Sequence, residues 1–182
     1  MILVVDMNWK KDSLAFFEFV LPIVTIAEQL DECMVRHYLD LTNEDLSYCE
    51  KIILSGTALE DNATLSQSEE FRWLLSTDKP VLGICAGMQT IGIVFGLVLE
   101  ECLEIGMTQI ATCKKNCLFS GEFKSYSLHN FSVEIGGDFE VIGRSDECVQ
   151  AIKHRSKPIY GVLFHPEVRN EEILKRFIQP RY

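Results

Sequence analysis

The stretch Lys79–Gln89, KPVLGICAGMQ, constrains the fold more than any other part of the chain. Val81 to Ile84 is a continuous apolar run, which predicts a buried strand, and a helix is expected to follow it directly. Cys85 stands at the junction in the pattern G-x-C-x-G, the cysteine counterpart of the nucleophile elbow G-x-S-x-G. In such a turn the side chain projects from strained backbone, and the glycines let neighbouring chain pass close by. The pentapeptide alone is also compatible with a second interpretation, in which Cys85 is a structural core cysteine that happens to lie between two glycines.

The first half of the chain predicts a parallel sheet with helices on both faces. Short apolar runs predict strands that are buried on both sides, and segments with helical periodicity lie between them. The strands are expected at 2–5, 33–39, 51–54 and 81–84, and the helices at 12–31, 42–48, 69–75 and 87–96. Pro22 predicts a kink or break in the first helix, and 62–68 is expected to be a polar loop. This alternation of strand and helix favours an α/β fold.

The second half predicts a small antiparallel strand set at one edge of a mostly parallel sheet. Short alternating segments at 104–112 and 116–119 lie among turn residues between Leu97 and Ser132. Further strands are expected at 139–143, 149–153 and 159–164, followed by an amphipathic helix over 170–178. The length of 182 residues favours a single domain over 1–182.

Composition narrows the class of protein. The formal net charge of −10 argues against binding to nucleic acid or to an anionic membrane. The apolar start Met1–Asp6 is typical of a strand and lacks the basic leader of a signal peptide, so the seven scattered cysteines are expected to be reduced thiols in a cytoplasm. Cys113 and Cys117 are close in sequence, but no second pair at zinc spacing accompanies them. We therefore expect no metal and no cofactor.

A cysteine nucleophile requires a base, and the base requires a group that orients it. His165 ends an apolar strand, which places it at the same carboxyl edge of the sheet as Cys85, and Glu167 follows two residues later. Glu167 could hold one imidazole nitrogen while the other faces the thiol, although H-P-E alone could equally be a surface turn. His37 is expected in the core or at a sheet edge, and His154, in a basic turn, is expected to be solvated.

Acyl transfer also requires hydrogen-bond donors for the oxyanion. The elbow itself supplies the N–H of Ala86. A second donor would come from the loop Ser55-Gly56-Thr57, which follows the neighbouring strand.

The motif GICAGMQ, together with a strand ending in His165-Pro166-Glu167, resembles the class I (triad) glutamine amidotransferases, and the resemblance covers nearly the whole chain. It implies a flavodoxin-like three-layer fold in which Cys85 is the nucleophile, His165 the base and Glu167 the group that orients it. The implied reaction is hydrolysis of L-glutamine through a cysteinyl thioester to glutamate and ammonia. The ammonia would pass to a separate ATP-dependent synthetase, and Gln89 matches a position that holds the substrate.

Within the family, the C-terminal part is most similar to the separate amidotransferase subunits of archaeal GMP synthases. The similarity lies in the segments 139–146, 150–154, 157–161 and 164–168. GMP synthase is therefore the leading synthetase partner that the resemblance implies.

Two segments depart from the family pattern. Ser55-Gly56-Thr57-Ala58 stands where S-G-G-P is usual, so Thr57 takes the place of the second glycine, whose N–H would join that of Gly56 near the oxyanion. Leu128-His129-Asn130-Phe131 stands where GMP synthases carry S-H-x-D, which implies that Leu128, Asn130 and Phe131 flank the substrate. The alternatives are a hydrolase of γ-glutamyl peptides or conjugates on the same scaffold, and a non-catalytic regulatory paralogue.

Overall fold

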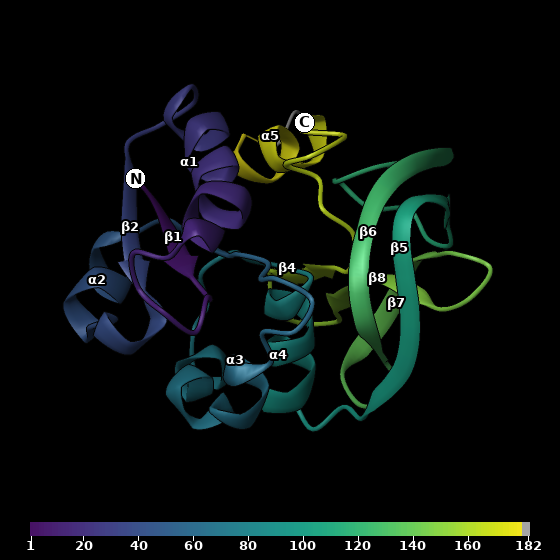
Figure 1. Cartoon of the computed structure of the whole chain (residues 1–182), viewed down its shortest axis with the longest axis horizontal. Helices are drawn as coiled ribbons and strands as arrows, with labels where there is room; N and C mark the ends of the chain where they lie inside the picture. The colour runs from purple at the N-terminus through teal and green to yellow at the C-terminus, as the bar shows by residue number, and fades with distance from the viewer. Residues whose placement is uncertain (180–182) are drawn as a thin grey trace.

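A computed structural model describes residues 1–179 of the chain. In these residues all strands belong to one mixed sheet with the order β2-β1-β3-β4-β9-β8-β7-β5-β6 (Figure 1). The first five strands in that order run parallel to one another, and each later strand is antiparallel to its neighbour. The parallel strands are β1 (Ile2–Asp6), β2 (Cys33–His37), β3 (Lys51–Leu54), β4 (Val81–Ile84) and β9 (Ile159–Val162). The antiparallel strands are β5 (Leu99–Thr112), β6 (Glu122–Val133), β7 (Phe139–Arg144) and β8 (Val149–His154).

Helices cover both faces of the parallel strands, which confirms the α/β expectation. On one face lie α1 (Leu21–Glu28) and α5 (Glu172–Ile178); on the other lie α3 (Ala63–Ser66), a 3-10 helix at Ser68–Leu75 and α4 (Ala86–Val94) (Figure 1). The helix α2 (Asn43–Tyr48) begins at Thr42 with a capping box. Strand β1 contributes Val4 to one core and Leu3 to the other. Its continuous apolar run is therefore explained by burial on both sides.

Helix α4 lies directly against the strands beneath it because two glycines leave room for it. A Cβ atom at Gly83 would stand 2.5 Å from the backbone carbon of Gly87, and one at Gly87 would stand 2.7 Å from the carbonyl oxygen of Leu54. Both distances are shorter than any real contact, so an alanine at either position would push the helix away. The glycines of the G-x-C-x-G motif thus fix the start of α4 on β3 and β4.

The long ribbon of β5 and β6 curls away from the parallel strands and returns past the start of α4 (Figure 1). The pairing runs from Leu99 with Val133 to Ala111 with Glu122, and a bulge interrupts it between Glu101 and Glu104. The ribbon brings residues 128–131 of β6 to the N-terminal end of α4.

Several expected elements are wrong in type or extent. The polar loop at 62–68 contains the short helix α3, and the expected strand at 116–119 is a loop in which Asn116 Oδ1 accepts hydrogen bonds from the N–H groups of Leu118 and Phe119. A polar side chain that binds nearby backbone in this way competes with strand pairing. The helix expected over 12–31 is a π-helix at Phe16–Val20 followed by α1, with Pro22 in the first turn of α1, where its missing N–H costs nothing.

The expectation that His154 is solvated is also wrong. Its side chain is buried, and its ring packs against the rings of Phe95 and Phe139. Its Nδ1 accepts hydrogen bonds from the N–H groups of Ser156 and Lys157, so the imidazole organises the turn after β8.

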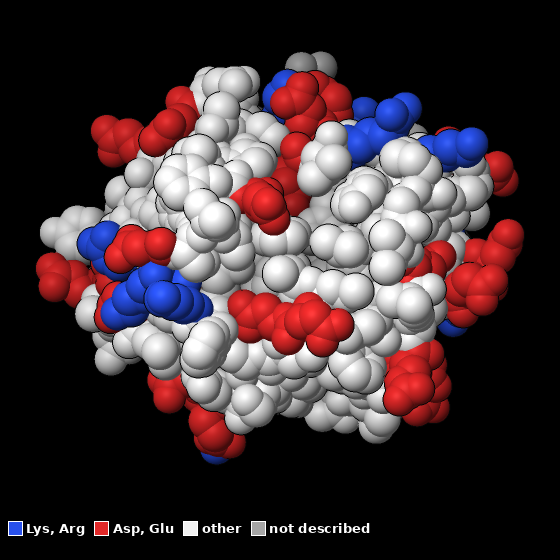
Figure 2. All heavy atoms as spheres, viewed as in Figure 1, with Lys and Arg blue, Asp and Glu red and all other residues white. Residues whose placement is uncertain are grey.

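The surface reflects the net charge of −10. Figure 2 shows acidic side chains around the rim and across the middle of one face, with basic side chains in small groups among them. Within residues 1–179, no helix is both long enough and apolar enough to cross a membrane.

Candidate active site

Cys85 lies at the sharp turn between β4 and α4. Its backbone has φ 48° and ψ −104°, a positive φ that is uncommon for a residue with a side chain. Its N–H donates to the carbonyl of Val162 in β9 at 2.8 Å, and its side chain is buried. Strained backbone of this kind persists only where the surrounding structure holds it, and it concentrates at functional sites.

His165 and Glu167 follow β9 and form a buried pair. Nδ1 of His165 lies 2.7 Å from Oε1 of Glu167, and both side chains are at most 1% exposed. The N–H of His165 donates to the carbonyl of Tyr126 in β6 at 2.8 Å, which fixes the backbone of the histidine. Nε2 of His165 is buried and has no hydrogen-bond partner among residues 1–179. The carboxylate therefore orients the ring and leaves the second nitrogen available.

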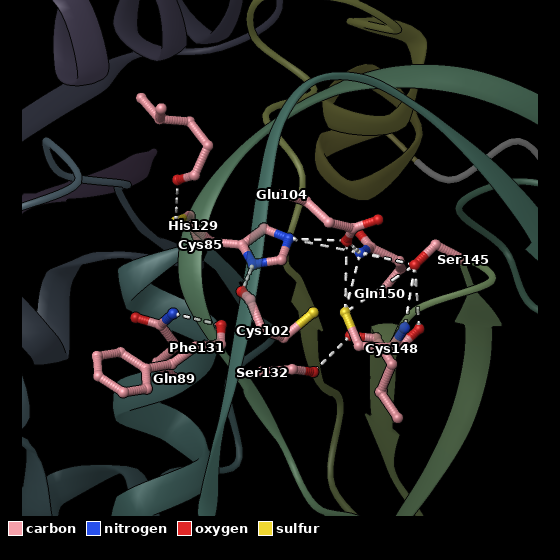
Figure 3. Close-up of polar contacts among 12 residues, drawn as sticks. Cys85, Gln89, Cys102, Glu104, His129, Phe131, Ser132, Ser145, Cys148 and Gln150 are labelled. Atoms are coloured by element: carbon pink, nitrogen blue, oxygen red, sulfur yellow. Dashed lines mark hydrogen bonds and ion pairs between the residues drawn. The ribbon is translucent and has the colours of Figure 1, made fainter.

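The charge state of His165 depends on its neighbours. Burial disfavours the charged ring, but the Glu167 carboxylate and the Cys85 thiol outweigh this effect and hold the pKa of His165 well above its ordinary value of 6.5. The thiol of Cys85 is thus close enough to influence the ring. The thiol itself donates to the carbonyl of Leu128 at 3.4 Å, so it faces β6 (Figure 3).

The loop after β3 lies against both Cys85 and His165. A Cβ atom at Gly56 would stand 2.6 Å from Cε1 of His165 and 3.5 Å from Cβ of Cys85. In the part of the chain that the structure describes, no hydrogen bond uses the N–H groups of Gly56, Thr57 or Ala86. These donors therefore remain free beside the thiol.

Strand β6 covers the elbow from the other side. Nε2 of Gln89 donates to the carbonyl of Phe131 at 2.8 Å (Figure 3), and Nδ2 of Asn130 donates to the carbonyl of Leu59 at 3.3 Å. Between these groups lies a cavity of about 10 Å³, which is the space of roughly one water molecule. It is lined by Thr57, Ala58, Leu59, Asp61, Asn62, Cys85, Gln89, Leu128, His129 and Asn130.

Most residues expected from the sequence meet around Cys85. Leu128, Asn130, Gln89 and Thr57 line the cavity, whereas Phe131 contributes its carbonyl oxygen. The hydroxyl of Thr57 donates to the carbonyl of Asp61 at 3.0 Å and so holds the loop closed on itself.

Sequence reasoning missed three residues that border this cavity, Leu59, Asp61 and Asn62. The one signal for them was their position in a polar loop after a strand that ends at the carboxyl edge of the sheet. Behind the cavity, His129 lies in a second cluster with the partly buried Cys102 and Glu104, whose ligand atoms could hold a metal ion.

The fold and the elbow have counterparts among known proteins. The model of the family "Glutamine amidotransferase class-I" matches residues 22–180. The chain therefore belongs to the class-I glutamine amidotransferase family.

Two curated relatives are glutamine-hydrolysing GMP synthase subunits from archaea. The one from Methanocaldococcus jannaschii is 40% identical over 114 residues, which cover 57% of this chain and 61% of the relative. The one from Methanococcus maripaludis strain C6 is 34% identical over 176 residues, covering 91% of this chain and 86% of the relative. The match to the first of these spans about three fifths of its length.

Solved structures share the fold. A protein from Thermoplasma acidophilum, provisionally named as a GMP synthase subunit, has a TM-score of 0.81 at 24% identity and covers 98% of this chain and 92% of its own. A glutamine amidotransferase from Thermotoga maritima has a TM-score of 0.73 at 16% identity, covering 98% of this chain and 81% of its own. The α/β architecture is thus that of class I glutamine amidotransferase structures.

Proposed function

We propose that the chain is the glutaminase subunit of a two-part enzyme and that Cys85, His165 and Glu167 form its catalytic triad. The observation that carries this proposal is the state of His165. Its Nδ1 is held by Glu167 at 2.7 Å, while its buried Nε2 is left without a partner beside Cys85. An imidazole arranged in this way can take a proton from a thiol and later return it to a leaving group.

In the proposed reaction, His165 accepts the proton of Cys85 and the thiolate attacks the amide carbon of glutamine. The N–H groups of Ala86, Thr57 and Gly56 stabilise the oxyanion. Collapse of the intermediate releases ammonia, which takes the proton from His165, and leaves a γ-glutamyl thioester on Cys85. Water then hydrolyses the thioester to glutamate. Gln89 and residues 128–131 would hold the substrate.

We infer further that the ammonia passes to a separate ATP-dependent synthetase, with GMP synthase as the leading candidate. The support is the identity of 34–40% to the archaeal GMP synthase relatives. The assay measures glutamate release from glutamine by the chain alone and with a GMP synthase ATP-pyrophosphatase subunit. Stimulation by that subunit, with formation of GMP, is the expected result. Glutamate release that does not change when the synthetase is added would contradict the assignment of this partner.

The small cavity implies that a loop moves when substrate binds. Glutamine is far larger than the space of about 10 Å³ beside Cys85, and we propose that the loop at 57–62 shifts away from β6 when it binds. The contact between Asn130 and the carbonyl of Leu59 would open in this motion. The carboxylate of Asp61 accepts from the N–H of Trp9, whose side chain is 67% exposed. We propose that the synthetase contacts the region of Trp9 and moves the loop through Asp61.

Two experiments distinguish the glutaminase from a conjugate hydrolase and from a non-catalytic paralogue: covalent labelling of Cys85 and a test of which substrates are hydrolysed. An electrophilic glutamine analogue is expected to alkylate Cys85 selectively in the presence of the partner, as mass spectrometry of the digested chain can establish. Failure of the label with and without partner would favour a non-catalytic paralogue. Turnover of γ-glutamyl conjugates without turnover of glutamine would favour a conjugate hydrolase.

We also propose a layer arrangement for the fold and a cellular compartment for the chain. The two covered faces support a flavodoxin-like three-layer arrangement, in one domain, with the antiparallel strands added at one edge. The seven free cysteines support a reducing compartment such as the cytoplasm.

A further inference from the structure

A second buried group of polar side chains lies behind β6, outside the proposed active site. It contains two thiols, an imidazole and a carboxylate, which come from two strands and one turn (Figure 3). Cys102 and Glu104 belong to β5, His129 to β6, and Cys148 precedes β8. The side chain of His129 is fully buried, that of Glu104 is 10% exposed, and Cys148 is 8% exposed. Packing of the hydrophobic core alone does not explain why thiol, imidazole and carboxylate groups gather at this place.

The donor atoms of the group have the spacing of a metal site. One ligand atom each from Cys102, Glu104 and His129 lie within 4.8 Å of one another. Nε2 of His129 is 3.1 Å and Sγ of Cys148 is 3.4 Å from Oε2 of Glu104. Around a tetrahedral zinc ion, normal bond lengths place a nitrogen and an oxygen ligand roughly 3.4 Å apart, and a sulfur and an oxygen roughly 3.6 Å apart. Cys148 is not part of this mutually close set of three, so its side chain must turn toward the other ligands to complete a tetrahedron.

The orientation of His129 also favours a cation. Nδ1 lies 3.0 Å from the carbonyl oxygen of Cys102, which can only accept, so Nδ1 must carry a proton. Nε2 then faces Oε2 of Glu104, a second acceptor. Either a second proton or a metal ion must separate these two atoms. A histidine that ligates metal commonly donates its other nitrogen to a backbone carbonyl.

Gln150 supports the carboxylate in the manner of an outer-shell residue. It is fully buried in β8, and its Nε2 donates to Oε2 of Glu104 and lies 3.3 Å from Sγ of Cys148 (Figure 3). Its Oε1 is buried and has no hydrogen-bond partner within residues 1–179. The amide Nε2 also lies 3.5 Å from Nε2 of His129, so it contacts three of the four proposed ligands.

The two thiols also face each other, so a disulfide is the competing assignment. The thiol of Cys148 is in contact with the thiol of Cys102. With a disulfide between these cysteines, a protonated His129 would pair with Glu104, whereas one metal ion would bind all four side chains.

We propose that Cys102, Glu104, His129 and Cys148 form a structural zinc site that joins β5, β6 and the start of β8. The site would anchor β6 on the side opposite to its contacts with the elbow residues, where the carbonyls of Leu128 and Phe131 accept from Cys85 and Gln89. Zn²⁺ binding releases the thiol protons, so the affinity falls as the pH is lowered. The proposal is independent of the proposed glutaminase activity, because its test reads metal binding directly.

The decisive experiment titrates the reduced, metal-stripped chain with Co²⁺. The expected result is a thiolate-to-cobalt charge-transfer band and the d–d bands of tetrahedral Co²⁺, saturating at one equivalent and lost on addition of Zn²⁺. Elemental analysis of the chain purified with a thiol reductant is expected to find one zinc per chain. Absence of the charge-transfer band from the reduced chain would overturn the proposal, and a Cys102–Cys148 disulfide in the unreduced chain would then be the correct assignment.

Variants assign the ligands. Cys148→Ser and His129→Gln are expected to abolish the stoichiometric cobalt spectrum and the rise in melting temperature that Zn²⁺ gives the parent. Cys49→Ala is the matched control, because Cys49 is equally buried in a core cluster but has no such neighbours. It is expected to keep both responses even where it lowers the melting temperature. Should the ligand variants not fold, the titration of the parent decides alone. Retention of the full spectrum in both ligand variants would overturn the assignment.

Discussion

The chain contains two groups of cysteine, histidine and glutamate side chains, one buried and one partly buried, and both are built around β6. In the first, the backbone of β6 binds the N–H of His165 and the thiol of Cys85. In the second, β6 supplies His129 itself. The histidines are held in opposite ways. The carboxylate of Glu167 occupies Nδ1 of His165 and leaves Nε2 free, whereas a carbonyl occupies Nδ1 of His129 and the carboxylate of Glu104 faces Nε2.

This difference teaches that the same three residue types can serve opposite roles. For His165, the carboxylate and the thiol outweigh burial and the pKa is raised, which suits a group that must accept and keep a proton. For His129, burial outweighs the carboxylate and the pKa is lowered, which suits a neutral metal ligand. A free Nε2 beside a thiol defines the candidate base, and an Nε2 surrounded by further donor atoms defines the candidate ligand.

The largest expected effect comes from removing Cys85, the proposed nucleophile of the first group. Cys85→Ala is expected to lower glutamate release by at least about 10³-fold, because no other group in the site can form the thioester. The metal content and the cobalt spectrum are expected to be unchanged. Glutaminase assays with the synthetase present measure the first quantity, and Cys113→Ser, at an exposed cysteine, is the control. If Cys85→Ala released glutamate at the rate of the parent, Cys85 would not be the nucleophile.

A smaller loss is expected when His165, the proposed base, is displaced and not removed. In Gly56→Ala the new Cβ would stand 2.6 Å from Cε1 of His165, so the ring must move. A displacement of about 1 Å in an active site costs roughly 10²-fold in rate, and we expect that fall in kcat. Gly136→Ala is the matched control, because its Cβ would meet only Leu97, at 3.9 Å. Equal activity of the two variants would show that His165 does not need its present position.

The parts of the molecule that the sequence predicted well are those with local signals. Apolar runs in the sequence predicted strands β1, β3 and β4. The two glycines around Cys85 predicted the elbow, and they allow α4 to pack closely against β3 and β4. Strand β6 was missed as a long strand because Lys124, Ser125 and Ser127 break its alternation. Ser125 and Ser127 are nevertheless fully buried by the curl of the ribbon, which no local pattern reveals.

The same contrast holds for the two sites. The expected partnership of Cys85, His165 and Glu167 could be inferred because each residue lies at the end of a recognisable strand on one sheet edge. The second group could not, because Cys102 and Cys148 lie at a bulge and in a turn, and strand register alone brings them together. The sequence expectation of no metal rested on Cys113 and Cys117, which are exposed and belong to neither group.

A moderate effect confined to the second group is expected from Gln150→Ala. This variant removes the donor that fixes Oε2 of Glu104 but leaves all four proposed ligands in place. Outer-shell changes of this kind typically weaken metal binding about 10–100-fold, and we expect a loss in that range with glutaminase activity kept. Competition with a chromogenic zinc chelator measures the affinity. An unchanged zinc affinity would show that Gln150 does not support the proposed ligands.

The smallest expected effect is a pH-dependent change in the free energy of unfolding. It tests whether Glu167 raises the pKa of His165. A raised folded-state pKa stabilises the protein fully at pH values below the unfolded value near 6.5, and this stabilisation is lost as the pH rises through the folded value. Glu167→Gln removes the carboxylate that raises the pKa, so the variant loses this contribution. Each unit of pKa corresponds to about 1.4 kcal/mol. The free energy of unfolding of the parent is therefore expected to exceed that of Glu167→Gln by more at pH 6 than at pH 9.

Urea unfolding at a series of pH values measures this difference, and the glutamine oxygen can still accept a hydrogen bond from Nδ1 of His165. The pH-dependent part is thus specific to the charge of His165. Were the difference between parent and variant constant from pH 6 to pH 9, Glu167 would orient His165 without controlling its protonation. The two histidines would then differ in geometry alone, and the free Nε2 of His165 would carry the whole distinction between base and ligand.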